Sequence, residues 1–265
     1  LIPSINLRYN YKDKLVFRAS YGRGYRAPTL KELYLNFFDS NHALKGNDQL
    51  KPEDGHCVNS SISYTLPVAK EHNITFAAAG FYNHINNKID FVFIPAPFPP
   101  DTYQYANLKK YITYGGNVSL GYQWKRLNLK ASGQLTHYQL SILGNQSNEI
   151  KMLSPDFTAS ASYLIPKAEI GINIHYKYTG AKPLYSLSGS YESGKQYAYN
   201  WLDVSLTRNF WKDRIQLTVG GKNLVAVKNI QKSSEVIIGH DADPNSANIG
   251  WGRTFFTSLV LHFSK

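Results

Sequence analysis

Hydrophobic and polar residues alternate one by one along most of this 265-residue chain. In residues 127–136, for example, Leu129 and Leu135 share one face of the expected strand, and Lys130 and Gln134 share the other. A period of two is typical of a strand whose two faces meet different surroundings. The pattern therefore predicts an all-β, antiparallel protein, with one apolar and one polar face along each strand.

Short and long connections alternate between the expected strands. Tight turns are predicted at residues 11–14, 66–72, 124–127, 166–169 and 211–214. Long loops are predicted at residues 24–55, 93–104, 140–154, 181–196 and 224–250, and prolines keep 95–102 out of any strand interior. This alternation gives about eleven strands and places the long loops at one end, as in outer-membrane barrels.

Two architectures fit such strands, a soluble sandwich and a transmembrane antiparallel β-barrel. The sandwich would have to bury the polar faces, which carry Lys130, Gln134, His175 and Lys177. A wide barrel lumen accepts these side chains, so the sequence favours the barrel. Bacterial single-chain barrels normally have an even number of strands, so about 11 strands are best interpreted as half of a barrel of about 22.

Composition narrows the function classes. Tyr is abundant, with 20 residues, which suits aromatic belts at membrane boundaries, and no apolar run reaches the length of a transmembrane helix. The net charge of +11 comes from scattered Lys and Arg, which disfavours nucleic-acid binding. Cys57 is the single cysteine, so no internal disulfide or cysteine-based zinc site is expected. No nucleophile or metalloprotease motif is present, so we expect no enzyme.

Residues 18–55 carry the most specific pattern. GRGYRAPTLKELY at 22–34 is followed by KGNDQLKPE at 45–53. These segments resemble the paired boxes of TonB-dependent outer-membrane receptors, a Phe/Tyr-Arg-Ala-Pro box and a Gly-Asn-Pro-Asp-Leu-Lys-Pro-Glu-like box. Asp48-Gln49 stands where that family has Pro-Asp. The terminal residues 252–263 also resemble the last strand of these receptors.

The resemblance implies that residues 1–265 form the C-terminal part of the receptor barrel, with the plug and the N-terminal strands outside this chain. It implies a multi-pass location in the bacterial outer membrane, in contact with its lipid. It also implies coupling to TonB–ExbB–ExbD through the missing N-terminal region, a surface lipoprotein as a further partner, and active import without covalent chemistry. Because the sequence begins directly with a strand-like segment, we expect no signal peptide within it.

The cargo is a further hypothesis. A YRAP box, a downstream Asn-x-x-Leu box and a histidine between them are similar to haem-uptake receptors. His42 is the histidine in that interval, and a neutral imidazole can ligate haem iron. Nearby rings could stack on a porphyrin. The candidate ligand-binding residues are therefore His42, Tyr25, Arg26, Tyr34, Phe37, Phe38 and Asn47.

A structural role for the two boxes is the competing interpretation. In it, Pro28 fixes the backbone, Arg26 pairs with an acid such as Glu32 or Glu53, and His42 is solvated. Cobalamin, an iron siderophore, or a glycan or peptide remain alternative cargoes, and a passive pore or an adhesin is a third hypothesis. No intrinsic cofactor is expected. HDADPN at 240–245 resembles a calcium loop only in its oxygens, since it lacks the glycine and distal glutamate.

Overall fold

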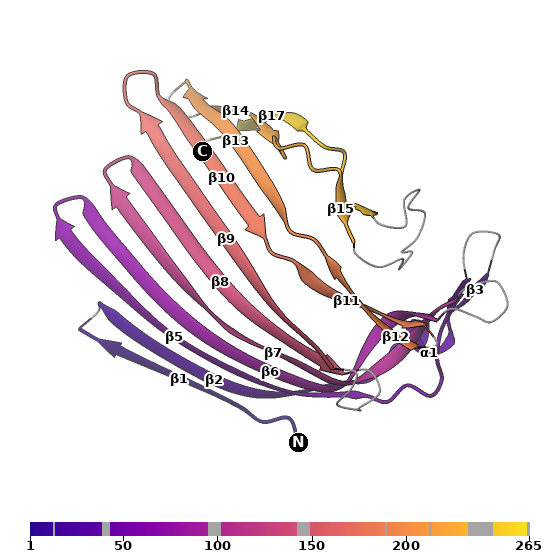
Figure 1. Cartoon of the computed structure of the whole chain (residues 1–265). Coiled ribbons are helices and arrows are strands. Elements are labelled where there is room, and N and C mark those ends of the chain that lie inside the picture. The colour runs from indigo at the N-terminus through magenta and orange to yellow at the C-terminus, as the bar shows by residue number, and fades with distance from the viewer. Residues whose placement is uncertain are drawn as a thin grey trace.

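The computed structural model describes residues 1–12, 14–38, 43–94, 102–141, 149–188, 190–211, 214–232 and 246–263. Long antiparallel strands form one curved sheet in the order β1-β2-β5-β6-β7-β8-β9-β10-β13-β14-β17 (Figure 1). The path holds eleven strands, as the alternation predicted. Their bounds are β1 (Ser4–Tyr11), β2 (Leu15–Arg26), β5 (Glu53–Ala69), β6 (His72–Ile94), β7 (Thr102–Trp124), β8 (Leu127–Ser141), β9 (Glu149–Ile165), β10 (Ile170–Thr179), β13 (Tyr199–Phe210), β14 (Ile215–Lys222) and β17 (Thr254–Leu261).

The register keeps the two faces chemically separate across the whole sheet. Lys130 pairs with Ser160, which pairs with His175, and this polar row lines hollows on the concave face. One residue along each strand, Leu129 pairs with Ala161 on the opposite, convex face. Large apolar side chains are exposed on that face, and Val118 keeps 54% of its surface exposed. The sheet therefore presents an apolar convex face and a polar concave face, as in a membrane barrel wall.

Tight turns join the strands at one end of the sheet (Figure 1). Each of these turns contains a residue with positive φ, namely Lys12, Glu71, Lys125, Glu169 and Trp211. Such a conformation lets a short hairpin loop follow the twist of its strands. The turn predicted at 66–72 is shorter than expected, because β5 continues to Ala69 with a register shift after Pro67.

The long connections gather at the other end, and several of them are more ordered than the sequence suggested. The 24–55 segment holds α1 (Leu30–Tyr34), β3 (Asn36–Phe38) and β4 (Ala43–Lys45), and β4 pairs in parallel with β7. The predicted loop at 181–196 is instead the hairpin of β11 (Lys182–Ser188) and β12 (Ser190–Gln196), and the 224–250 segment holds β15 (Asn229–Gln231) and β16 (Ser246–Asn248). Residues 95–101, 142–148 and 233–245 lie outside the described residues, and the HDADPN segment lies among them.

The buried apolar residues of the described chain lie mainly at this loop-bearing end. Val92, Leu108 and Leu140 have almost no exposed surface, and Ile89 and Ile112 are buried beside them along β6 and β7. Extended backbone from β11 contacts β6 in the same region. The loop base is therefore the packed part of the molecule. No helix within the described ranges has the length and apolar character needed to cross a membrane.

Candidate functional site

Arg26, the last residue of β2, bridges two carboxylates at the loop base. Its Nη1 donates to both oxygens of Glu32 at 2.9 Å, and its Nη2 donates to Oε1 of Glu53 at 2.7 Å. Glu53 begins β5 directly opposite Arg26 in the register, whereas Glu32 comes from α1. The ion pairs therefore tie the short helix to the ends of two long strands. We call these three residues the outer-end clamp.

A capping box positions Glu32 within the clamp. The Thr29 side chain accepts a hydrogen bond from the Glu32 N–H, and the Glu32 carboxylate accepts one from the Thr29 N–H at 2.7 Å. Such a reciprocal pair satisfies backbone groups that the first turn of a helix leaves unpaired. Pro28 precedes the cap, so the chain enters α1 from a fixed backbone direction.

The second box packs against this helix. A Cβ at Gly46 would lie only 2.6 Å from the carbonyl oxygen of Leu33, so glycine allows the close approach. The Asn47 N–H donates to the Glu32 carbonyl, and the Asn47 side chain donates to the Tyr105 carbonyl on β7. Leu50 is buried behind them. The box is thereby held to both α1 and the sheet.

Asn107 on β7 completes the brace. Its Oδ1 accepts from the Lys51 N–H at 2.7 Å, and its Nδ2 donates to the carbonyls of Lys51 and Asn87. A single amide thus satisfies backbone groups of two other segments, as a side chain with both donor and acceptor can. Nothing in the pattern around residue 107 singled this residue out, because its partners are distant in sequence.

The clamp carboxylates are ionised at neutral pH. Burial raises the pKa of Glu53, but hydrogen bonds from Arg26 and from the Ile89 N–H lower it by more. The pKa therefore lies below its ordinary value. Burial likewise raises the pKa of Glu32, and the bonds from Thr29 and Arg26 outweigh it. The pKa of Arg26 is raised, chiefly by the hydrogen bond to Glu53. All these groups therefore keep the charges that hold the clamp together.

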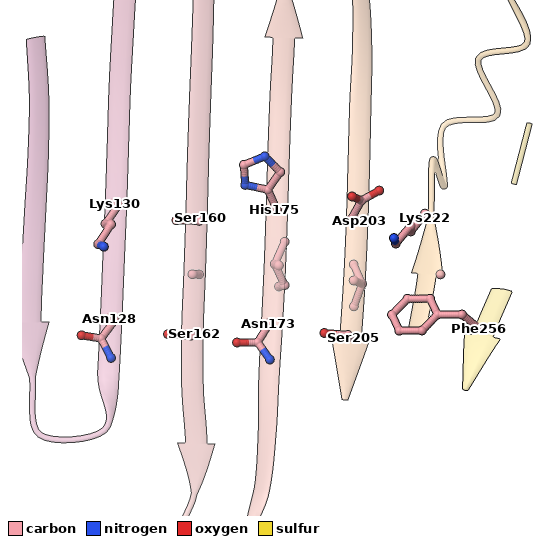
Figure 2. A pocket seen from close by; sticks show the side chains of 14 residues that line it. Asn128, Lys130, Ser160, Ser162, Asn173, His175, Asp203, Ser205, Lys222 and Phe256 are labelled. Carbon is pink, nitrogen blue, oxygen red and sulfur yellow. The ribbon is translucent and has the colours of Figure 1, made fainter. Parts of the chain in front are cut away.

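A second region of interest is a hollow on the concave face, with a volume of about 560 Å³. Figure 2 shows a row of side chains across five strands, formed by Lys130, Ser160, His175, Asp203 and Lys222. Amide and hydroxyl side chains form the adjoining row: Asn128, Ser162, Asn173 and Ser205. These two rows of polar side chains line the hollow, and we call them the concave wall. Within the described ranges, no group of three or more His, Cys, Asp or Glu side chains is placed to hold a metal ion.

The family model described as "TonB dependent receptor-like, beta-barrel" matches residues 1–224. The chain belongs to this family of TonB-dependent receptor barrels. The family comprises outer-membrane transport receptors, which are not enzymes. A comparison with curated proteins found no match.

Solved structures of TonB-dependent receptors share the fold. They include a mutant of the ferric enterobactin receptor PfeA of Pseudomonas aeruginosa in complex with enterobactin (TM-score 0.63, 20% identity, 97% of this chain and 40% of that chain). The copper transporter OprC gives a TM-score of 0.67 at 15% identity, with 98% and 39% covered. The siderophore receptor PirA of Acinetobacter baumannii gives 0.62 at 16%, with 97% and 40% covered. This chain therefore spans about 40% of the length of these structures.

The predicted site residues of this receptor barrel fall into separate groups. The structure confirms the expected pairing of Arg26 with an acid, and both named acids take part. Tyr34, Phe37 and Phe38 are exposed aromatic side chains on α1 and β3, at the loop-bearing end. A ligand role for any of these residues stays a prediction.

Tyr25 and His42 stand apart from that group. Tyr25 is also exposed, but it precedes Arg26 on β2, so its side chain lies on the opposite face of the strand from that clamp residue. His42 lies outside the described residues, so its role as an iron ligand stays a prediction as well. The concave wall was not among the predicted site residues, although the alternation of Lys130 and His175 with apolar neighbours was the signal that could have marked it.

Proposed function

We propose that this chain forms part of an outer-membrane importer that binds a metal chelate at its outer loops and passes it inward with energy from TonB. The supporting observation is the loop base, where the outer-end clamp ties α1 to the sheet, β4 links β3 to β7, and aromatic side chains are exposed. Family membership and the siderophore and metal transporters of similar fold support the same class of cargo. The chain itself would lie in the bacterial outer membrane.

The clamp and the aromatics have different parts in this proposal. Arg26 directs its guanidinium at two carboxylates of its own chain, so we assign it, with Asn47, to holding the loop base. Tyr34, Phe37 and Phe38 are exposed, and a flat aromatic or macrocyclic ligand can stack on such rings. A rigid base beneath exposed rings lowers the ordering cost of binding.

An iron siderophore is the cargo we favour, because two of the structures of similar fold are described as siderophore receptors. Haem, suggested by His42 and the YRAP box, is the second cargo hypothesis. The two differ in their need for an imidazole ligand, since haem iron is commonly held by a histidine nitrogen. A receptor for a siderophore has no such requirement of His42.

The test uses the full-length receptor. Uptake of iron-labelled chelates is measured in cells with and without TonB, and binding to the purified receptor is followed by absorbance titration with a ferric catecholate siderophore and with haem. For the double variant F37S/F38S we expect about tenfold weaker binding, because each aromatic contact contributes about 0.5–1.5 kcal/mol. The variant W211S is the matched control, since Trp211 is an exposed aromatic residue at the opposite, tight-turn end.

Two outcomes contradict parts of the proposal. TonB-independent entry, or no uptake of either chelate, would contradict the importer. Unchanged binding in F37S/F38S would contradict the aromatic contact alone. Comparing H42A with the parent receptor for haem and for the siderophore then separates the two cargoes, because only haem binding should depend on His42.

A further inference from the structure

The convex face changes from apolar to charged toward the loop-bearing ends of β7, β8 and β9. On β7, Val118 is followed on the same face by Tyr114 and then by Lys110. Side chains alternate along a strand, so Tyr114 and Lys110 share this face at a separation of about 13 Å. The next two strands repeat the order on the same face, with Leu135, His137 and Gln139 on β8 and Phe157, Leu153 and Lys151 on β9. Apolar side chains thus give way to rings and then to charge.

The rings mark the boundary of the apolar band. Tyr114 lies directly opposite Tyr82 on one side and His137 on the other, and its ring centre is 4.7 Å from that of His137. Both tyrosines are exposed. Rings with a polar tip gather where acyl chains meet headgroups in membrane barrels. The interface between acyl chains and headgroups is therefore expected near Tyr82 and Tyr114.

Beyond the rings, two lysines share one carboxylate. The Nζ of Lys151 is 3.1 Å from Oε2 of Glu149, and the Nζ of Lys110 is 3.9 Å from Oε1. The Gln139 side chain donates a hydrogen bond to the same carboxylate. The Glu149 side chain is 17% exposed, whereas those of Lys110 and Lys151 are 40% and 58% exposed. A largely covered carboxylate thus holds two accessible ammonium groups, and one positive charge is left over.

The position of this cluster decides which partner it can meet. A convex barrel face points away from the lumen, so the cargo path and any domain inside the barrel lie on the other side of the wall. Carboxylates of the neighbouring strands have cations of their own, since Asp54 pairs with Arg23 and Asp90 with Lys88. Residues 142–148, which connect β8 to β9, contain no acidic residue. The excess positive charge therefore faces the membrane surface.

We propose that Lys110 and Lys151 bind the phosphate of a phosphorylated, multiply acylated glycolipid in the outer leaflet. Its acyl chains would lie along the apolar band, where Leu135, Leu153 and Phe157 are exposed. Lysine is a common phosphate ligand, and basic residues at a membrane surface strengthen the attachment of anionic lipid. The loop-bearing end faces outward in barrels of this kind, which selects the outer leaflet. This lipid site goes beyond the proposed import function and is independent of the cargo.

The experiment uses the purified full-length receptor in a non-ionic detergent. Native mass spectrometry measures the affinity for diphosphorylated lipid A and for the same glycolipid with both phosphates removed. The double variant K110Q/K151Q removes the two charges, and K110R/K151R keeps them. K70Q/K167Q is the matched control, because both lysines are exposed in tight turns at the opposite end. Heat-modified gel mobility verifies folding, and K151Q, in which Lys110 and Gln139 still hold Glu149, replaces the double variant if that variant does not fold.

The phosphate site predicts a loss that depends on the phosphates. In K110Q/K151Q, the affinity for diphosphorylated lipid A should fall about tenfold, and in K151Q about threefold, because each lysine contributes separately. The affinity for the dephosphorylated glycolipid should stay within about twofold of the parent. K110R/K151R and K70Q/K167Q should bind like the parent. Unchanged affinity in K110Q/K151Q, an equal loss for the dephosphorylated glycolipid, or an equal loss in K70Q/K167Q would overturn the site.

Discussion

The outer-end clamp and the concave wall treat charge in opposite ways. At the clamp, one arginine meets two carboxylates of its own chain, and both carboxylates are largely shielded from solvent. On the wall, Lys130 and Lys177 point from the sheet without a described carboxylate partner. The clamp ties α1 to the ends of β2 and β5, whereas the wall is held mainly by its backbone ladder. The charges of the clamp therefore contribute to the structure of this chain, whereas Lys130 and Lys177 have no described carboxylate partner within it.

Because of this difference, mutations in the two motif boxes and mutations on the wall should have different effects. The boxes combine ion pairs, a capping box and a glycine contact, so their loss should change stability first. Lys130 and Lys177 on the wall have no described ion pair, so their loss should change stability little. Both expectations require that the convex and concave faces meet different solvents.

The largest effect is expected from a charge on the convex face. Val118 lies between Tyr114 and Tyr122 on the face that exposes apolar side chains. V118R should destabilise the membrane-inserted barrel by about 2–4 kcal/mol, because an arginine near the bilayer midplane must be desolvated. N117R, one residue along on the concave face, is the control and should change stability by less than about 0.5 kcal/mol. Urea unfolding in lipid vesicles measures both, and equal effects would mean that the faces are assigned wrongly.

Removing an acid from the clamp should have the next largest effect. In E53A, Arg26 loses one carboxylate and the Ile89 N–H loses its acceptor. We expect about 2 kcal/mol less protection of the loop base, because charge-assisted hydrogen bonds are lost and a buried donor is left unpaired. Hydrogen exchange of residues 26–34 and 46–53 in the full-length receptor measures this local opening.

E53Q sharpens the same measurement. The amide oxygen can still accept from the Ile89 N–H, but the negative charge opposite Arg26 is gone. Protection in E53Q should therefore lie between the parent and E53A. If E53A exchanges like the parent, the clamp does not hold the loop base.

Lowering the pH should weaken the clamp progressively, as its carboxylates become protonated. The pKa values of Glu32 and Glu53 are lowered from 4.5 in the folded chain, so their stabilising contribution is complete above that value. It is lost as the pH falls through the lowered folded-state values. Exchange protection of the loop base, corrected for intrinsic rates, should be constant from neutral pH to about pH 5 and fall below pH 4. E53Q should show a smaller decline, and a decline already present near pH 6 would require another titrating group.

Much of the fold could be predicted from the sequence because it depends on a local rule. Alternation of apolar and polar residues fixes which face of each strand meets lipid, and the spacing of turns fixes the strand order. The ion pairing of Arg26 could also be predicted, because the YRAP box places this arginine near Glu32 in the sequence and the second box supplies Glu53. These features need only short-range pattern or a motif.

The remainder depended on contacts between segments far apart in sequence. Asn107 forms hydrogen bonds with the backbone of Lys51 and Asn87, and no sequence pattern near residue 107 predicts these contacts. The β11–β12 hairpin has a Ser-, Gly- and Tyr-rich sequence that is typical of an irregular loop, yet its backbone pairs. The concave wall could not be predicted, because only the register of several strands brings Lys130, His175 and Lys222 into one row.

The smallest stability effect should come from the wall itself. Lys130 has no described hydrogen bond or ion pair, so K130A should change the free energy of unfolding by less than about 0.5 kcal/mol, as is usual for such surface positions. The matched measurement is the unfolding of K130A beside E53A in the same lipid vesicles. A loss comparable to that of E53A would mean that Lys130 holds part of the structure, and the contrast between satisfied and unsatisfied charge would fail. An unchanged unfolding curve would show that the backbone ladder holds this part of the sheet without Lys130.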